Sequence, residues 1–226
     1  MTALVKASID ASLFIQVLTL FLNLFAFTIP LDKWDFALKE ILGLETLVQI
    51  VELIFYSWYR GELVQKNYDV TQFRYYDWFI TTPTMLFSTA SYYAYLNEKE
   101  EPQKEPFSIV RFLKENASWI VWMFVLNALM LWFGFLQEMD ILSLTWSSLL
   151  GYASLLGSFG LLYANTVSKT PQQQGLFWFM FGVWSLYGVA AMLPSKEKNI
   201  SYNVLDVFAK NFYGLYLGYL IYRRQI

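Results

Sequence analysis

The chain has 226 residues, of which 57% are hydrophobic, 20% are aromatic and only 15% are charged, and its mean hydropathy is +0.38. This composition is more apolar than that of a soluble domain and indicates a membrane protein. The absence of cysteine and histidine excludes disulfides, thiolate metal sites and the usual proton shuttle, and a net charge of −2 argues against nucleic acid as a partner. We therefore expect no metal site, and proton chemistry has to use carboxylates, lysine, tyrosine and water.

Seven apolar stretches of about 20 residues, the length that crosses the hydrocarbon of a bilayer, alternate with short polar connections. We expect helices at residues 5–29, 37–59, 71–96, 108–133, 140–164, 175–193 and 201–222. No connection is long enough for a second domain, so the prediction is one all-α membrane domain over residues 1–226, a seven-helix bundle. The first stretch lacks the features of a signal peptide and is predicted to be a retained helix. Basic residues outside the spans favour an external N-terminus and a cytoplasmic C-terminus.

Four charged residues fall within two of these spans, although an ionised side chain at the centre of a bilayer costs roughly 3 kcal/mol. Arg74 and Asp77 belong to RYYDWFITTP in the third span, and Asp206 and Lys210 belong to LDVFAKN in the seventh. Asn203, Asp206 and Lys210 share one helix face, so a bundle can bury a balanced quartet of charges. The residues leave two interpretations open. One is a structural ion cluster or a transporter's ion path, and the other is a lysine that condenses with an aldehyde beside a carboxylate counter-ion.

RYYDWFITTP and LDVFAKN resemble the two signatures of the microbial (type 1) rhodopsins, and the resemblance covers essentially the whole chain. It implies all-trans retinal in the core of the bundle, bound covalently to Lys210 as a Schiff base. It makes Asp77 the first counter-ion and proton acceptor, makes Asp206 the second counter-ion, and places Arg74 one turn toward the outside. The remaining implied residues are Trp78, Thr82 and Pro83 along the chromophore, Thr81 as a hydrogen-bond partner of Asp77, and Trp184 and Tyr187 on the sixth helix.

The chain departs from the family pattern at three positions. Many members have a proline after the tyrosine of the sixth helix and a tryptophan three residues further on, where this chain has Gly188 and Ala191. In outward proton pumps a carboxylate of the third helix returns a proton to the Schiff base, and here that position is Ser88. A hydroxyl has no proton to give at neutral pH. The triplet Asp77, Thr81 and Ser88 therefore weakens the interpretation as an efficient pump.

Polar residues also form a stripe along each of the first two expected helices, at spacings of three and four residues. The stripes consist of Ser8, Ser12, Gln16, Thr19 and Asn23, and of Glu45, Gln49, Glu52, Tyr56 and Tyr59. They can face each other and two asparagines of the seventh helix, Asn203 and Asn211. Interhelical hydrogen bonds, worth about 0.6 to 2 kcal/mol each in membranes, are one explanation. Two glutamates seven residues apart without a basic neighbour favour the other, a hydrated path that attracts cations.

This pattern is similar to that of the group 1 viral rhodopsins of giant viruses, which are light-gated cation channels inhibited by calcium. The resemblance implies a path for monovalent cations (Na⁺, K⁺ or H⁺) between helices one, two, three and seven, in a membrane of a virus-infected host cell. The expected path residues are Ser12, Glu45, Glu52, Asn203 and Asn211 at constrictions, Gln16 and Asn23 from the stripe alone, and Arg74, Thr81 and Ser88. A light-driven outward proton pump and a sensory rhodopsin remain alternatives, and none of the three is an enzyme.

Overall fold

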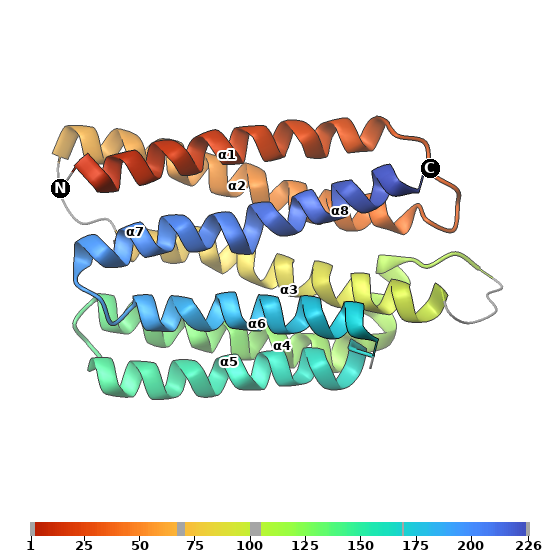
Figure 1. The fold of residues 1–226 in the computed structure, drawn as a ribbon. Helices are drawn as coiled ribbons and strands as arrows, with labels where there is room; N and C mark the ends of the chain where they lie inside the picture. Colours follow the sequence, from red (N-terminus) through yellow and green to blue (C-terminus); the bar gives the residue numbers. More distant parts are fainter. Residues whose placement is uncertain (1–2, 67–70, 100–104, 169, 225–226) are drawn as a thin grey trace.

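The computed structural model describes residues 3–66, 71–99, 105–168 and 170–224. These residues form an up-and-down bundle of seven helices, without a strand in the described ranges, which confirms the predicted fold class (Figure 1). The seventh helix is one continuous rod of three segments. The elements are α1 (Ala3–Thr28), α2 (Ala37–Lys66), the 3₁₀ turn η1 (Thr71–Phe73), α3 (Arg74–Lys99), α4 (Ile109–Glu138), α5 (Leu144–Thr166), α6 (Pro171–Ala190), α7 (Ser195–Asp206), the π-helical segment η2 (Val207–Asn211) and α8 (Phe212–Arg223).

Several helices begin or end away from the predicted residues, for local reasons. The fifth begins at Leu144 rather than at 140, because Asp140 has a positive φ of 58° and Ser143 caps the helix. The sixth begins at Pro171 rather than at 175, with Thr170 as its N-cap and proline in the first turn. The seventh begins at Ser195 rather than at 201, since the polar run that predicted a loop is helical. Polarity therefore marks where an apolar stretch ends, while caps mark where the helix ends.

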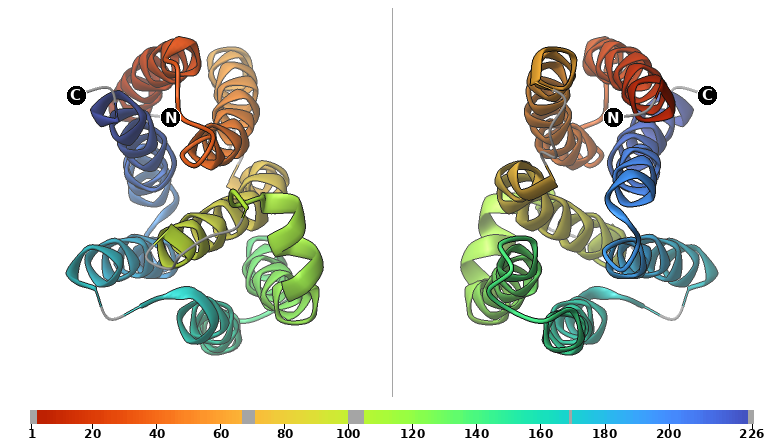
Figure 2. Two further views of the ribbon diagram at one scale, coloured as in Figure 1. Left: turned by 90° about the vertical axis from the view of Figure 1, so that its right-hand side faces the viewer. Right: turned by 90° about the vertical axis from the view of Figure 1, so that its left-hand side faces the viewer.

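The third helix lies in the middle of the bundle. Seen along the helices, α3 passes between a group formed by α1, α2 and the seventh helix and a group formed by α4, α5 and α6 (Figure 2). Helix α1 begins at one end of the bundle and α8 ends at the other (Figure 1). We call these the N-terminal and the C-terminal end. A residue in the middle of α3 can therefore contact both groups, which suits the helix that carries the first signature.

Helix α1 turns its polar side inward. Gln16, Thr19 and Asn23 are fully buried, whereas Phe14 and Phe21 are 71% and 74% exposed. An exposed apolar face costs free energy in water and none in hydrocarbon, so this polarity fits a lipid environment. By length and composition alone, four of the described helices can cross a membrane, namely α1, α2, α4 and α5. The seventh helix is not among them because its segments α7 and α8 have only 12 residues each.

An ion cluster at the C-terminal end ties the connection between α1 and α2 to two other helices. Asp35 accepts hydrogen bonds from Lys99 and Tyr95 of α3, and its carboxylate lies 3.5 Å from Nε of Arg224, just after α8. Burial alone would raise the pKa of Asp35, but the hydrogen bonds from Lys99 and Tyr95 and the charges of Lys99 and Arg224 outweigh it and hold this pKa below its ordinary value of 3.8. The cluster stabilises the fold only while Asp35 is ionised.

This cluster predicts a dependence of stability on pH. Because the pKa of Asp35 is lower in the folded chain than in the unfolded chain, its stabilising contribution is complete at neutral pH and is lost as the pH falls below about 3.8. We expect Asp35→Asn to lower the melting temperature at neutral pH and to have little effect at about pH 2. Thermal unfolding of the detergent-solubilised protein measures both. Asp32→Asn in the same connection is the control, and equal losses at both pH values would contradict the prediction.

Gly188 of α6 predicts a second effect on stability. A Cβ atom at this position would lie 2.6 Å from Cζ of Tyr152, whose hydroxyl donates to the carbonyl of Ser185 at 2.8 Å. Gly188→Ala should therefore displace a fixed ring, and overpacking of this kind costs about 1–3 kcal/mol. Gly182→Ala on the same helix is the matched control, because a Cβ atom there meets nothing within 4 Å. Equal free energies of unfolding for the two variants would show that the ring yields freely.

Candidate functional site

The four charged residues of the two signatures meet inside the bundle. Arg74 and Asp206 are 0% exposed, Lys210 is 1% exposed and Asp77 is 4% exposed. Nζ of Lys210 lies 2.5 Å from Oδ2 of Asp77 and 3.4 Å from Oδ1 of Asp206, and Nη1 of Arg74 lies 3.5 Å from Oδ2 of Asp206. The two cations and two carboxylates balance within one cluster. Removing one member would leave an uncompensated buried charge, which is strongly destabilising.

The two carboxylates differ in how completely they are hydrogen-bonded. Asp206 accepts hydrogen bonds of 2.7 Å from the hydroxyls of Tyr56 and Tyr187, one on each oxygen. Asp77 is bonded only through Oδ2, and its Oδ1 has no partner among the described residues. Thr81 donates to the backbone carbonyl of Asp77 at 2.9 Å and not to its carboxylate. Asp77 is therefore the carboxylate with a free oxygen that can take a proton.

Neutral groups surround Arg74 on the side facing the N-terminal end. Its guanidinium donates to the side-chain oxygens of Asn199 and Asn203 and to the hydroxyl of Tyr56, and Asn203 donates in turn to Ser8 at 2.8 Å. Sequence reasoning missed Asn199 and the contact of Tyr56 with Asp206. Both carried a signal, because Asn199 lies four residues before Asn203 on the same helix face and Tyr56 belongs to the stripe of α2. The network fixes the guanidinium without another carboxylate.

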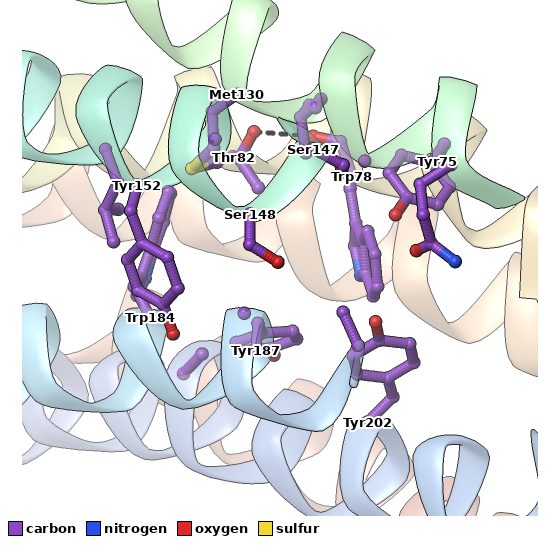
Figure 3. A pocket seen from close by; sticks show the side chains of 18 of the residues that line it. Tyr75, Trp78, Thr82, Met130, Ser147, Ser148, Tyr152, Trp184, Tyr187 and Tyr202 are labelled. Carbon is purple, nitrogen blue, oxygen red and sulfur yellow. Dashed lines mark hydrogen bonds between the residues drawn. The ribbon is translucent and has the colours of Figure 1, made fainter. Parts of the chain in front are cut away.

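A mostly apolar cavity begins at Lys210 and runs between α3 and the helices α4, α5 and α6 (Figure 3). Of the residues expected along the chromophore, Trp78, Thr82, Trp184 and Tyr187 line this cavity, and Pro83 does not. Pro83 is rotated by about 100° from Thr82 around the helix axis, so it points away from the face that carries residues 78, 82 and 85. Thr82 donates to the carbonyl of Trp78 at 2.7 Å and accepts from Asn127 at 2.8 Å.

The cavity fits a linear polyene aldehyde. An amine lies at one end of it, two carboxylates lie within hydrogen-bonding distance of that amine, and two tryptophans line the apolar walls. A protonated imine on Lys210 would find its counter-ions in place, and a flat apolar chain would find aromatic surfaces. The residues present are thus those that a retinal Schiff base requires.

The stripes of α1 and α2 face the seventh helix and α3. Their members from Ser12 to Asn23 and from Glu45 to Glu52 are between 0% and 2% exposed. Asn211 donates to Glu52 at 3.2 Å, Gln16 donates to Ser12 at 3.1 Å, and Ser88 donates to Glu45. The structure therefore brings the predicted path residues of four helices into one buried region.

Many polar atoms of this region have no protein partner. In the described part of the chain these atoms are Oε1 of Gln16, Oγ1 of Thr19, both amide atoms of Asn23, Oε2 of Glu45, both amide atoms of Gln49, Oε1 of Glu52 and Oδ1 of Asn211. Nearly all buried polar groups in proteins are hydrogen-bonded, to protein or to ordered water. A set of this size on neighbouring helices therefore calls for internal water.

Comparison with known proteins agrees with this geometry. The chain matches the family model for bacteriorhodopsin-like proteins over residues 7–223. No curated protein sequence matches it. Its structure is similar to that of the viral rhodopsin OLPVRII, with 27% identity, a TM-score of 0.83 and 99% of each chain covered.

Two further solved structures share the fold at lower identity. A blue light-absorbing proteorhodopsin from Med12 has 19% identity and a TM-score of 0.74, with 98% of each chain covered. The light-driven proton pump rhodopsin of Coccomyxa subellipsoidea has 16% identity and a TM-score of 0.67, with 97% of each chain covered. Members of this family bind retinal through a Schiff base. The chain, an integral membrane protein with the seven-helix fold, belongs to the bacteriorhodopsin-like family of microbial rhodopsins.

Proposed function

We propose that the protein binds all-trans retinal covalently on Lys210 and acts as a light-gated channel for monovalent cations. The observation that carries the channel is the buried region between α1, α2 and the seventh helix, where polar atoms without protein partners adjoin the cluster of Lys210 and Asp77. Two buried glutamates, Glu45 and Glu52, give this region a preference for cations over anions.

The residues around Lys210 hold and move one proton. Bound retinal supplies the absorption of visible light and a change of shape on illumination. Nζ of Lys210 holds the proton in the dark, between Asp77 and Asp206. Asp77 accepts it on illumination because its Oδ1 is free, whereas Asp206 keeps its charge because Tyr56 and Tyr187 donate to both of its oxygens.

This proton movement can open the path. Once Asp77 is neutral, one of the two ion pairs between α3 and the seventh helix is lost, and the weaker contacts of that helix can rearrange. These contacts include the hydrogen bond from Asn211 to Glu52 on the C-terminal side and the contact of Asn203 with Arg74 on the N-terminal side. Water entering both sides would join the two stripes into one hydrated route.

One contact favours a second candidate, an outward proton pump. Ser88 stands where such pumps carry a proton-returning carboxylate, and its hydroxyl donates to Glu45 of α2. Glu45 could therefore supply, through Ser88, the proton that a hydroxyl alone cannot give. In that case light would move protons in one direction only, and the stripes would serve proton transfer or packing.

The proposal includes the orientation and setting of the protein. The C-terminal end of the bundle would face the cytoplasm, the transported ions would be Na⁺, K⁺ or H⁺, calcium would inhibit the current, and the membrane would be that of a virus-infected host cell. More of the described basic residues lie at the C-terminal end than at the other, which supports this orientation. The C-terminal end holds Lys33, Lys39, Lys99, Arg111, Lys114, Arg223 and Arg224, while Lys104 and Lys169 lie outside the described residues.

If retinal is bound to Lys210, removing the amine of this lysine should abolish the colour of the protein. Lys210→Ala, expressed in the presence of all-trans retinal, should show no absorption band in the visible, because no other lysine lines the cavity among the described residues. Lys196→Ala is the matched control, since this lysine lies at the start of the same helix, does not line the cavity and should keep the band. Absorption spectra of the purified proteins make the measurement, and a coloured Lys210→Ala protein would contradict the assignment.

The channel assignment predicts a loss of current without a loss of colour. Glu52→Gln and Glu45→Gln should each reduce the light-induced current about tenfold, the change in rate given by about 1.4 kcal/mol in barrier height. Glu40→Gln, at the first turn of the same helix, should leave the current unchanged. Voltage-clamp recordings at two external sodium concentrations measure the current. For wild type, a reversal potential that moves with sodium indicates a channel, and an outward current at every voltage indicates the pump.

A further inference from the structure

The end of the cavity farthest from Lys210 forms a polar chamber. It lies toward the N-terminal end of the bundle, and we call it the annex. Its lining includes a residue from each of five helices, namely Tyr75 of α3, Gln137 of α4, Ser148 of α5, Ala191 at the end of α6 and Tyr202 of α7.

Contacts between neighbouring helices place these residues at one level. The rings of Tyr75 and Tyr202 lie 5.1 Å and 4.9 Å from that of Trp78, measured between centroids. Gly134 lies one turn before Gln137 on α4. A Cβ atom at Gly134 would lie 2.6 Å from the Tyr75 hydroxyl. α5 and α6 run in opposite directions (Figure 1), so the contact of Tyr152 with Gly188 brings Ser148 and Ala191 to the same level one turn further on.

The hydroxyl groups of the annex differ from those of the rest of the cavity, although Nε1 of Trp78 and Nε1 of Trp184 also have no partner among the described residues. Near the lysine and along the walls, the hydroxyls of Thr82, Ser147, Tyr152 and Tyr187 all donate hydrogen bonds to the protein. In the annex, the side chains of Tyr75, Gln137, Ser148 and Tyr202 line the cavity, and none of the four forms a side-chain hydrogen bond with another residue that the structure describes. Tyr202 is only 1% exposed and Tyr75 9%, and Figure 3 shows Ser148 pointing into the cavity.

The side chain at residue 191, which also lines the annex, is small, because Ala191 contributes a single methyl group. An unsubstituted apolar ring placed here would leave buried donors and acceptors without partners, which protein sites avoid. A ring that carries an oxygen would satisfy them, and a site that hydrogen-bonds a ligand hydroxyl rejects the analogue that lacks it.

We propose that the preferred ligand of this cavity is a retinal whose ring bears an oxygen substituent, a hydroxyl or a keto group, and that the annex holds this oxygen. The inference rests on the retinal part of the proposed function and not on the choice between channel and pump. Lys210 binds the aldehyde end, Trp78 and Trp184 enclose the polyene, and Ser148 and Tyr202 contact the oxygenated ring.

A competition experiment tests this. The full-length protein, expressed without retinoid and reconstituted in lipid nanodiscs, is incubated with equal amounts of all-trans-retinal and all-trans-3-hydroxyretinal. The bound aldehydes are then released as oximes and quantified by chromatography. We expect wild type to bind the hydroxylated form in about tenfold excess, and Ser148→Ala and Tyr202→Phe, which remove one hydroxyl each without adding volume, to reduce this excess.

Filling the annex gives a second measurement. Ala191→Trp should bind all-trans-retinal and lose the preference, whereas Ala153→Trp, on an exposed face of α5, should keep it. A wild type that binds both aldehydes equally or prefers the unsubstituted ring overturns the inference and means that water fills the annex. A preference unchanged in Ser148→Ala, Tyr202→Phe and Ala191→Trp overturns the assignment to the annex. Failure of both aldehydes to form a coloured protein would refute the retinal proposal itself.

Discussion

The balance of charge around Lys210 is the constraint on which the rest of the structure depends. Two cations and two carboxylates lie within one buried cluster, where an unpaired ion would be strongly destabilising. Meeting that constraint requires α3 at the centre of the bundle and the seventh helix beside it. The seventh helix adopts a π-helical turn at Val207–Asn211, the segment that carries the lysine. Such turns are frequent at functional sites because they alter which side chains share a face.

The two sides of this cluster are built differently. Toward the N-terminal end, Arg74, Asn199, Asn203 and Tyr56 form a closed network of hydrogen bonds. Toward the C-terminal end, the amide of Asn23 fills a notch at Gly214, where a Cβ atom would lie 2.8 Å from its Nδ2, yet neither amide atom has a partner in the described residues. The first side is therefore held by hydrogen bonds within the protein, whereas the second has buried polar atoms that lack partners among the described residues and would rearrange more easily.

The sequence predicted what depends on spacing and missed what depends on contact. Helix number, the charged quartet and the burial of both stripes follow from apolar length and from periods of three and four residues. The starts of α6 and the seventh helix did not follow, because polar residues there are helical. Nor did the pairing of Ser88 with Glu45 or the position of Pro83, because a single chain does not reveal how a helix is rotated about its axis. The role of Asn199 was readable from its spacing to Asn203, but only once Arg74 was known to lie beside it.

The fold cannot separate a channel from a pump, since it is shared with a light-driven proton pump. A channel and a pump differ in how much buried polar surface they need between the chromophore and the ends of the bundle. A proton pump needs one chain of donors and acceptors, and Glu45 with Ser88 already provides its last step. Beyond Glu45 and Ser88, the protein carries further buried atoms without partners among the described residues. These atoms belong to Gln16, Thr19 and Asn23 of α1 and to Gln49 of α2. Their unmet hydrogen bonds are costly unless water enters, and a hydrated route beside two buried glutamates is the environment that favours cations. The surplus of unsatisfied groups along α1 and α2 is therefore the physical reason to favour conduction.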